Sequence, residues 1–146
     1  MRSVCCTLFL TAILVSAATT PSSATAAQTQ PAETATQFYL RWRTTVLSAT
    51  SVDAITGFWT ADTVHEFKME PESVRAETLP MLKRFYGTQT DVKVVKETVT
   101  PTGATLSLEA IDGAHQPIVS SVDVFKEDGA WKIGNAVEQW KPKGHD

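Results

Sequence analysis

Apolar side chains recur at helical spacing early in the chain. Five positions at i, i+3, i+4, i+7 and i+11 form one stripe on a helix of about 3.6 residues per turn: Ala35, Phe38, Tyr39, Trp42 and Val46. Thr34 stands just before the stripe, where its hydroxyl can cap a helix. Arg41 and Arg43 fall on the opposite side. The pattern predicts an amphipathic first helix from residue 33 onward.

Two more helices are expected before the strands begin. A short helix is predicted over 52–58, and a longer one over 72–86 that ends at Gly87. Pro80 lies inside the longer segment and should kink or split it, because proline has no amide hydrogen to donate. The apolar face predicted for this helix consists of Val74, Thr78, Met81, Leu82 and Phe85.

Residues 63–69 lie between these two helices and alternate in polarity. Such alternation is typical of a strand, whose successive side chains point to opposite faces. A strand here places His65, Phe67 and Met69 on one face. The segment is therefore predicted to be a short strand with a partly buried, inward His65.

The second half of the chain has the pattern of an antiparallel meander. Strands are predicted at 91–99, 104–110, 118–126 and 131–137, and the last of them could extend to residue 140. Asp128 and Gly129 form a hairpin signal between the last two, because glycine tolerates the positive φ of such turns.

Several of these strands carry apolar residues on both faces, as Val94 with Val95 and Val124 with Phe125. We therefore expect the sheet to curve strongly, with helices filling its concave side. The predicted fold class is α+β: three N-terminal helices packed in the concave face of a strongly curved, mainly antiparallel sheet, in the form of a cone or half-barrel.

Residues 1–26 have the layout of a signal peptide. Arg2 is followed by an apolar run over 4–15, and Ala24-Thr25-Ala26 provides a small-x-small cleavage site. We place cleavage after Ala26, with cleavage after Ala27 as the near alternative. An uncleaved membrane anchor is the competing interpretation. A membrane span needs roughly 20 apolar residues, however, and the run over 4–15 is shorter than that.

Cleavage leaves a flexible leader over 27–32, a domain over 33–140 and a polar tail over 141–146. Both cysteines, Cys5 and Cys6, lie in the signal peptide, so the mature chain is predicted to have neither thiols nor disulfides. We expect an exported protein, periplasmic or secreted, without a stable membrane anchor.

Composition narrows the chemistry further. The 146 residues include 13 Lys and Arg against 16 Asp and Glu, a net charge of −3, and this balance argues against nucleic acid as a partner. The sequence has no Gly-rich phosphate loop, nucleophile elbow or HExxH motif. His65 and His115 lack metal-ligand spacing. We therefore predict neither a cofactor nor a metal site.

The closing segment VFKEDGAWKIGNAVEQW, residues 124–140, has the "K-x-x-G-x-W-K-I" ending common in one group of α+β domains. Together with the Phe58-Trp59 step and the order of three helices before a meander, it resembles the nuclear transport factor 2-like superfamily, the cystatin-like α+β cone. The similarity covers about 33–140, and the chain is most similar to exported bacterial members of unassigned activity.

The resemblance implies a ligand site inside the cone, between the concave sheet face and the helices. The side chains expected to line it are Phe38, Tyr39, Trp42, His65, Phe67, Phe85, Trp131 and Asn135. For the aromatic stripe of the first helix, ordinary core packing is the alternative interpretation, and both can hold at once.

Three functional hypotheses remain open. The preferred one is a non-enzymatic exported domain that binds a small apolar or amphipathic ligand in the cone, or a protein partner on the sheet, including a second copy as a homodimer. The second is a small isomerase or hydro-lyase with an inward His65 as general base; a structural or surface histidine is the alternative. The third is a structural module of an envelope assembly.

Overall fold

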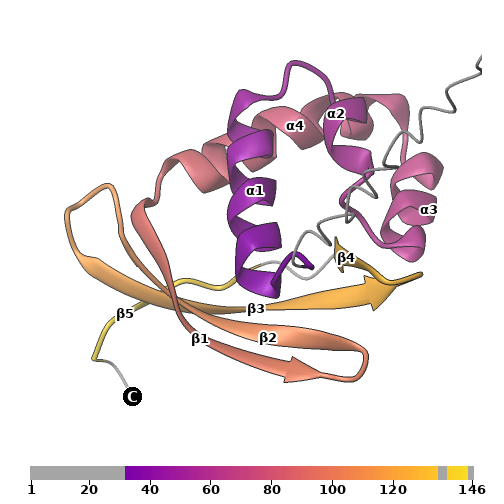
Figure 1. Cartoon of the computed structure of the whole chain (residues 1–146). Helices are drawn as coiled ribbons and strands as arrows, with labels where there is room; N and C mark the ends of the chain where they lie inside the picture. Colours follow the sequence, from indigo (N-terminus) through magenta and orange to yellow (C-terminus); the bar gives the residue numbers. More distant parts are fainter. Residues whose placement is uncertain (1–31, 135–137, 145–146) are drawn as a thin grey trace, which may run out of the picture. The chain divides into compact units, whose positions relative to one another are not determined.

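The described part of the chain is an α+β arrangement in which the helices precede the strands (Figure 1). The computed structural model describes residues 32–134 and 138–144, which lie in the unit formed by residues 32–146. Its helices are α1 (Ala35–Ser48), α2 (Asp53–Thr56), α3 (Ala61–Met69) and α4 (Glu72–Gly87). Its strands are β1 (Thr90–Thr100), β2 (Gly103–Ile111), β3 (Pro117–Glu127), β4 (Ala130–Ile133) and β5 (Lys141–Pro142). The proposed signal peptide and leader fall almost entirely outside the described residues.

Helix α1 forms as the apolar stripe predicted. Thr34 Oγ1 accepts from the Gln37 backbone N–H at 3.1 Å, and the Thr34 N–H donates to Gln37 Oε1 at 3.0 Å. This reciprocal pair satisfies two amides at the helix start that have no partner within the helix. The five stripe residues are all buried: Ala35, Phe38, Tyr39, Trp42 and Val46.

The predicted strand over 63–69 is wrong, because this segment belongs to α3. Thr60 caps the helix by accepting from the Thr63 N–H at 3.2 Å. Val64 and Phe67 stand three positions apart and pack against the core, so the run fits a helical period as well as a strand period. The described part of the chain thus has four helices before the sheet, where three were expected.

Helix α4 continues through Pro80 without being split. Its predicted apolar face is confirmed in part: Leu82 and Phe85 pack against the core. The buried residues of the helix are Leu79 and Tyr86, however, and the predicted Val74 and Met81 are exposed. Helix α2 is shorter than the predicted 52–58 because it ends with Gly57 as its C-cap.

The strands form an open antiparallel sheet in the order β1-β2-β3-β4, which confirms the meander. Asp128 and Gly129, with φ values of 50° and 79°, make the tight turn between β3 and β4. Strand β5 also pairs with β3, so the predicted polar tail contributes a short strand instead. Residues 135–137 of the predicted last strand lie outside the described part.

The core lies between α1 and one face of the sheet. Leu106 and Leu108 of β2 and Val122 and Val124 of β3 point to that face, and they belong to the same buried cluster as the stripe of α1. Alternation along β2 is as predicted, because every second side chain from Ala104 is buried.

Gly103, the first residue of β2, allows an unusually close approach between β2 and β3. A Cβ at this position would overlap the carbonyl oxygen of Val124 and lie 3.3 Å from Cα of Phe125. Both are backbone atoms of the paired strand, so relief requires the two strands to separate.

We expect Gly103→Ala to lower the free energy of unfolding by about 1–3 kcal/mol, the usual range for inserting an extra carbon into a tightly packed site. Urea unfolding followed by circular dichroism measures the change. Gly113→Ala is the matched control, because a Cβ there meets no atom within 4 Å. Equal losses in the two variants would contradict the close approach.

Candidate functional site

A pocket of about 420 Å³ opens where the start of α1, the segment after α2 and the β3–β4 hairpin come together. We call it the hairpin pocket. It is lined by Ala32, Glu33, Phe38, Arg41, Gly57, Phe58, Lys126, Gly129, Ala130, Trp131 and Lys132. The hairpin that forms one of its walls is therefore far from the other two segments in the sequence.

Three aromatic rings give the hairpin pocket its apolar surface. The rings of Phe38 and Phe58 have centroids 5.9 Å apart and are tilted by 39°. Trp131 stands on β4, and its indole N–H donates to the backbone oxygen of Glu33 at 2.8 Å. This bond ties the hairpin to the residue before the cap of α1. The half-buried indole at 131 is thus held in place at one end by a hydrogen bond, as buried indoles usually are.

Three cations line the same pocket: Arg41, Lys126 and Lys132. The Lys126 ammonium lies 4.7 Å from the centre of the Trp131 ring, a cation–π contact. Lys132 Nζ donates to the carbonyl oxygen of Gly57 at 2.7 Å. The ion pairs given for the described ranges, Arg41–Glu33 and Lys143–Glu109, include neither lysine. Both ammonium groups therefore add positive charge to the hairpin pocket.

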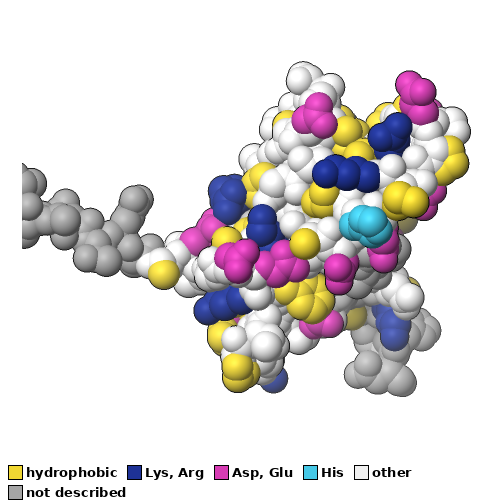
Figure 2. Space-filling view, turned by 90° about the vertical axis from the view of Figure 1, so that its right-hand side faces the viewer, with side chains coloured by type: hydrophobic (Ala, Val, Ile, Leu, Met, Phe, Trp, Pro, Cys, Tyr) yellow, Lys and Arg dark blue, Asp and Glu magenta, His cyan; other side chains and the backbone are white. Residues whose placement is uncertain are grey.

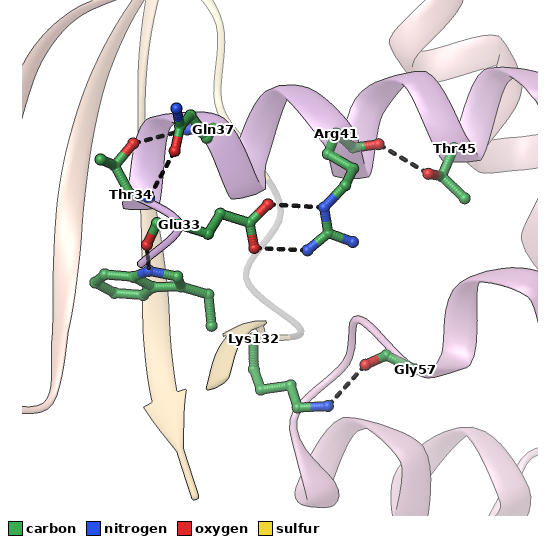
Figure 3. A network of polar contacts seen from close by, with 8 residues as sticks. Glu33, Thr34, Gln37, Arg41, Thr45, Gly57 and Lys132 are labelled. Atoms are coloured by element: carbon green, nitrogen blue, oxygen red, sulfur yellow. Dashed lines mark hydrogen bonds and ion pairs between the residues drawn. The ribbon is translucent and has the colours of Figure 1, made fainter. Parts of the chain in front are cut away.

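Glu33 is the one carboxylate among the residues that line the hairpin pocket, and it pairs with Arg41 (Figure 3). Arg41 Nε and Nη2 donate to Glu33 Oε1 and Oε2, both at 2.7 Å. The guanidinium also lies 4.7 Å from the Phe58 ring centre and 5.6 Å from that of Phe38. Hydrogen bonding from Arg41 lowers the pKa of Glu33 below its ordinary value, so this carboxyl is ionised at neutral pH.

A second polar cluster is buried in the core. The Tyr39 hydroxyl donates to both carboxylate oxygens of Glu138 at 3.0 Å, and the Tyr86 hydroxyl donates to Oε1 at 3.0 Å. Trp42 Nε1 donates to the hydroxyl oxygen of Tyr86 at 3.0 Å. Glu138 is only 5% exposed. These four side chains form what we call the Glu138 network.

Burial raises the pKa of Glu138, although the hydrogen bonds from Tyr39 and Tyr86 oppose the shift. Burial and the nearby Glu138 charge raise the pKa of both tyrosines far above the ordinary value. The hydroxyls therefore stay protonated and serve as donors. No member of the network lines the hairpin pocket, so we interpret the network as structural.

Arg43 was predicted on the polar side of α1, and this prediction is wrong: the residue is 6% exposed. Its guanidinium donates to Gln89 Oε1 at 3.0 Å and to the backbone oxygen of Tyr86 at 3.1 Å. It also lies 4.8 Å from the centre of the Tyr86 ring. A buried arginine needs hydrogen-bond acceptors of this kind. They are supplied by Tyr86 of α4 and by Gln89 just after that helix, so the pattern of α1 alone could not reveal them.

The residues predicted to line a site are found in several places. Phe38 and Trp131 line the hairpin pocket, whereas Tyr39 and Trp42 belong to the Glu138 network. Phe67 is half-buried against Trp59, with ring centroids 5.2 Å apart, and the half-buried Phe85 contacts the ring of Tyr86. Asn135 lies outside the described residues.

His65 is exposed on α3, so the expectation of an inward His65 is wrong. The error follows from the secondary structure, because a helix turns this position away from the face that Val64 and Phe67 share. An exposed position on α3 does not give His65 the partly buried setting that the general-base hypothesis requires.

Sequence reasoning missed Glu33, Lys132 and Glu138 as site or network residues. Glu33 and Lys132 carry no pattern of their own, since only the folded hairpin places them beside α1. Glu138 gave one weak signal, an acid between the apolar residues Val137 and Trp140. Its tyrosine partners are 52 and 99 residues away in the chain.

Other pockets offer less to a ligand. One of about 380 Å³ beside α3 has Asp62, Glu66 and Glu127 with a single lysine among its lining residues. Another of about 650 Å³ between the α1–α2 connection and α4 has Arg75 and Lys83 but no aromatic ring. Acidic, basic and apolar side chains are interspersed over the face shown in Figure 2. The hairpin pocket alone of these three combines rings with an excess of positive charge.

Comparison with protein-family models, curated proteins and solved structures found no match. Within the described residues, no group of three or more His, Cys, Asp and Glu side chains could hold a metal ion. No helix in that part of the chain is long and apolar enough to span a membrane. The geometry of the hairpin pocket is therefore the feature from which a function can be inferred.

Proposed function

We propose that the chain is an exported, non-enzymatic domain that binds a small amphipathic anion in the hairpin pocket. One observation carries the proposal: three aromatic rings and three cations line a single pocket whose one carboxylate is already paired. The volume of about 420 Å³ falls within the roughly 300–1,000 Å³ usual for small-molecule sites. Rings bury the apolar part of a ligand, while the cations attract its charge.

The hairpin pocket differs from the ligand site that the family resemblance implied, which included Tyr39 and Trp42. Tyr39 and Trp42 are fully enclosed by the core and bonded within the Glu138 network, so they offer a ligand no surface. The hairpin pocket lies at the edge of that core, where the rings of Phe58 and Trp131 are partly exposed. A ligand there binds without displacing any buried side chain.

We also propose that the fold is a nuclear transport factor 2-like cone with the helices on the concave side of the sheet. It is supported by the helices-first order, the antiparallel meander and the shared cluster of α1 and sheet residues. Export is supported by the pattern of residues 1–26 in the sequence. A homodimer through the sheet and a role in an envelope assembly remain predictions from the sequence.

Arg41→Gln tests the ligand site directly. We expect it to weaken binding of 2-naphthoate by up to about fivefold, since the Arg41 side chain is 52% exposed and an ion pair of an exposed group contributes up to about 1 kcal/mol. Isothermal titration calorimetry of the full chain at low salt measures the change. Lys93→Gln, which removes an exposed cation from β1, is the matched control and should leave the affinity unchanged.

The neutral analogue 2-naphthamide separates charge recognition from ring stacking. The proposal predicts that it binds much more weakly than 2-naphthoate to the unmodified chain. Equal binding of the two compounds, or an Arg41→Gln variant with full affinity for the carboxylate, would contradict recognition of an anion at this site.

A further inference from the structure

We infer that Glu33 is a built-in competitor: its carboxylate occupies the edge of Arg41 to which a ligand's own carboxylate binds. The inference rests on the proposed function and makes it narrower. The ligand class becomes a planar carboxylate attached to an apolar or aromatic body. Glu33 becomes a residue that sets its affinity and selectivity.

Glu33 and Arg41 already pair in the geometry by which arginine binds a carboxylate. Arg41 presents Nε and Nη2 to the two oxygens of Glu33 at equal distances of 2.7 Å. Two parallel N–H···O bonds are the arrangement by which arginine recognises carboxylates in general. The hairpin pocket thus already holds one carboxylate in a bidentate site, supplied by the chain itself.

The Arg41 guanidinium is also held in place by contacts that do not involve Glu33. Its cation–π contacts with the rings of Phe58 and Phe38, at 4.7 and 5.6 Å, hold it beside the apolar wall. When Glu33 leaves, Arg41 keeps this position. An incoming carboxylate then finds the same two donors, and the body attached to it lies against the rings.

The Glu33 side chain can leave Arg41 at a small cost in free energy. The side chains of Arg41 and Glu33 are 52% and 35% exposed, and exposed pairs change an equilibrium by up to about fivefold. The backbone of Glu33 stays anchored, because its carbonyl accepts from Trp131 Nε1. Only the side chain has to rotate, while the Trp131 wall of the pocket remains.

The test compares two variants that each remove one negative charge near the hairpin pocket. We expect Glu33→Gln to tighten 2-naphthoate binding by about two- to fivefold in calorimetry. Asp128→Asn is the matched control: Asp128 precedes the pocket residue Gly129, and asparagine tolerates its φ of 50°. This control should leave the affinity nearly unchanged, and 2-naphthamide should bind both variants as it binds the unmodified chain.

Equal tightening by the two variants would overturn the inference, because net charge alone would then explain the effect. An unchanged affinity in Glu33→Gln would also overturn it, since the ligand would then use a different edge of Arg41. If neither the unmodified chain nor Glu33→Gln binds 2-naphthoate, the proposed function itself fails. Circular dichroism of each variant checks that the fold is retained.

Discussion

Trp42→Ala is expected to lower the free energy of unfolding by about 3–5 kcal/mol, the usual cost of truncating a buried tryptophan. Trp42 is 2% exposed at the centre of α1. Its ring lies 5.6 Å from that of Phe58 and 6.2 Å from that of Tyr86, the latter edge-on at 90°. Alanine removes these contacts and leaves a cavity between α1 and α4.

Chemical denaturation with urea measures this loss at neutral pH. Leu40→Ala is the matched control, because Leu40 lies on the same helix and is 39% exposed. We expect that control to cost less than about 1 kcal/mol, as exposed truncations usually do. A similar loss in both variants would contradict a core centred on the Trp42 stripe.

Tyr39→Phe should destabilise the protein by about 1.5–3 kcal/mol once Glu138 is ionised, the usual contribution of a hydrogen bond to a charged group. Tyr39 is fully buried and its hydroxyl contacts both oxygens of Glu138. With Glu138 protonated, the bond joins two neutral groups and the cost falls to about 0.5–1.5 kcal/mol.

The direction of the pH dependence follows from the raised pKa of Glu138. In the folded state this group holds its proton at pH values where the unfolded chain, with a pKa of 4.5, has lost it. Its contribution to stability is therefore fully present below pH 4.5 and is lost as the pH rises through the folded pKa. Tyr39→Phe removes a donor to the charged form, so it should steepen that loss.

A double-mutant cycle with Glu138→Gln isolates this effect. Glutamine keeps the shape of the side chain but does not ionise, so the cost of Tyr39→Phe should become small and independent of pH in that background. Urea unfolding between about pH 4 and about pH 9 measures the free energy of unfolding of all four proteins in the cycle. A cost that stays pH-dependent in the Glu138→Gln background would show that another group is responsible.

Elements with one strong period could be predicted from the sequence. The stripe of α1 repeats over more than three turns, and β2 alternates without interruption, so each pattern fits one structure only. The alternating segment in α3 is too short to fit one structure only. Its seven residues place apolar side chains at the spacing of a helix and also at the spacing of a strand. The cap at Thr60, the deciding feature, lay just outside the alternating run.

The candidate site could be predicted only in part. Phe38 and Trp131 were found because large aromatic side chains in amphipathic elements border the core. The charges of the hairpin pocket could not be found, since Glu33, Arg41 and Lys132 look like ordinary surface residues in the sequence. What makes them a site is the hairpin turning at Gly129 to lie beside α1, which is a long-range contact.

The most direct test of the central claim is to follow the indole N–H resonances of the full chain by NMR while 2-naphthoate is added. Trp131 lines the hairpin pocket, whereas Trp42 lies in the Glu138 network. We predict a saturable shift of the Trp131 signal with the Trp42 signal unmoved. A shift of Trp42 without Trp131, or no saturable shift of either, would contradict binding in the hairpin pocket.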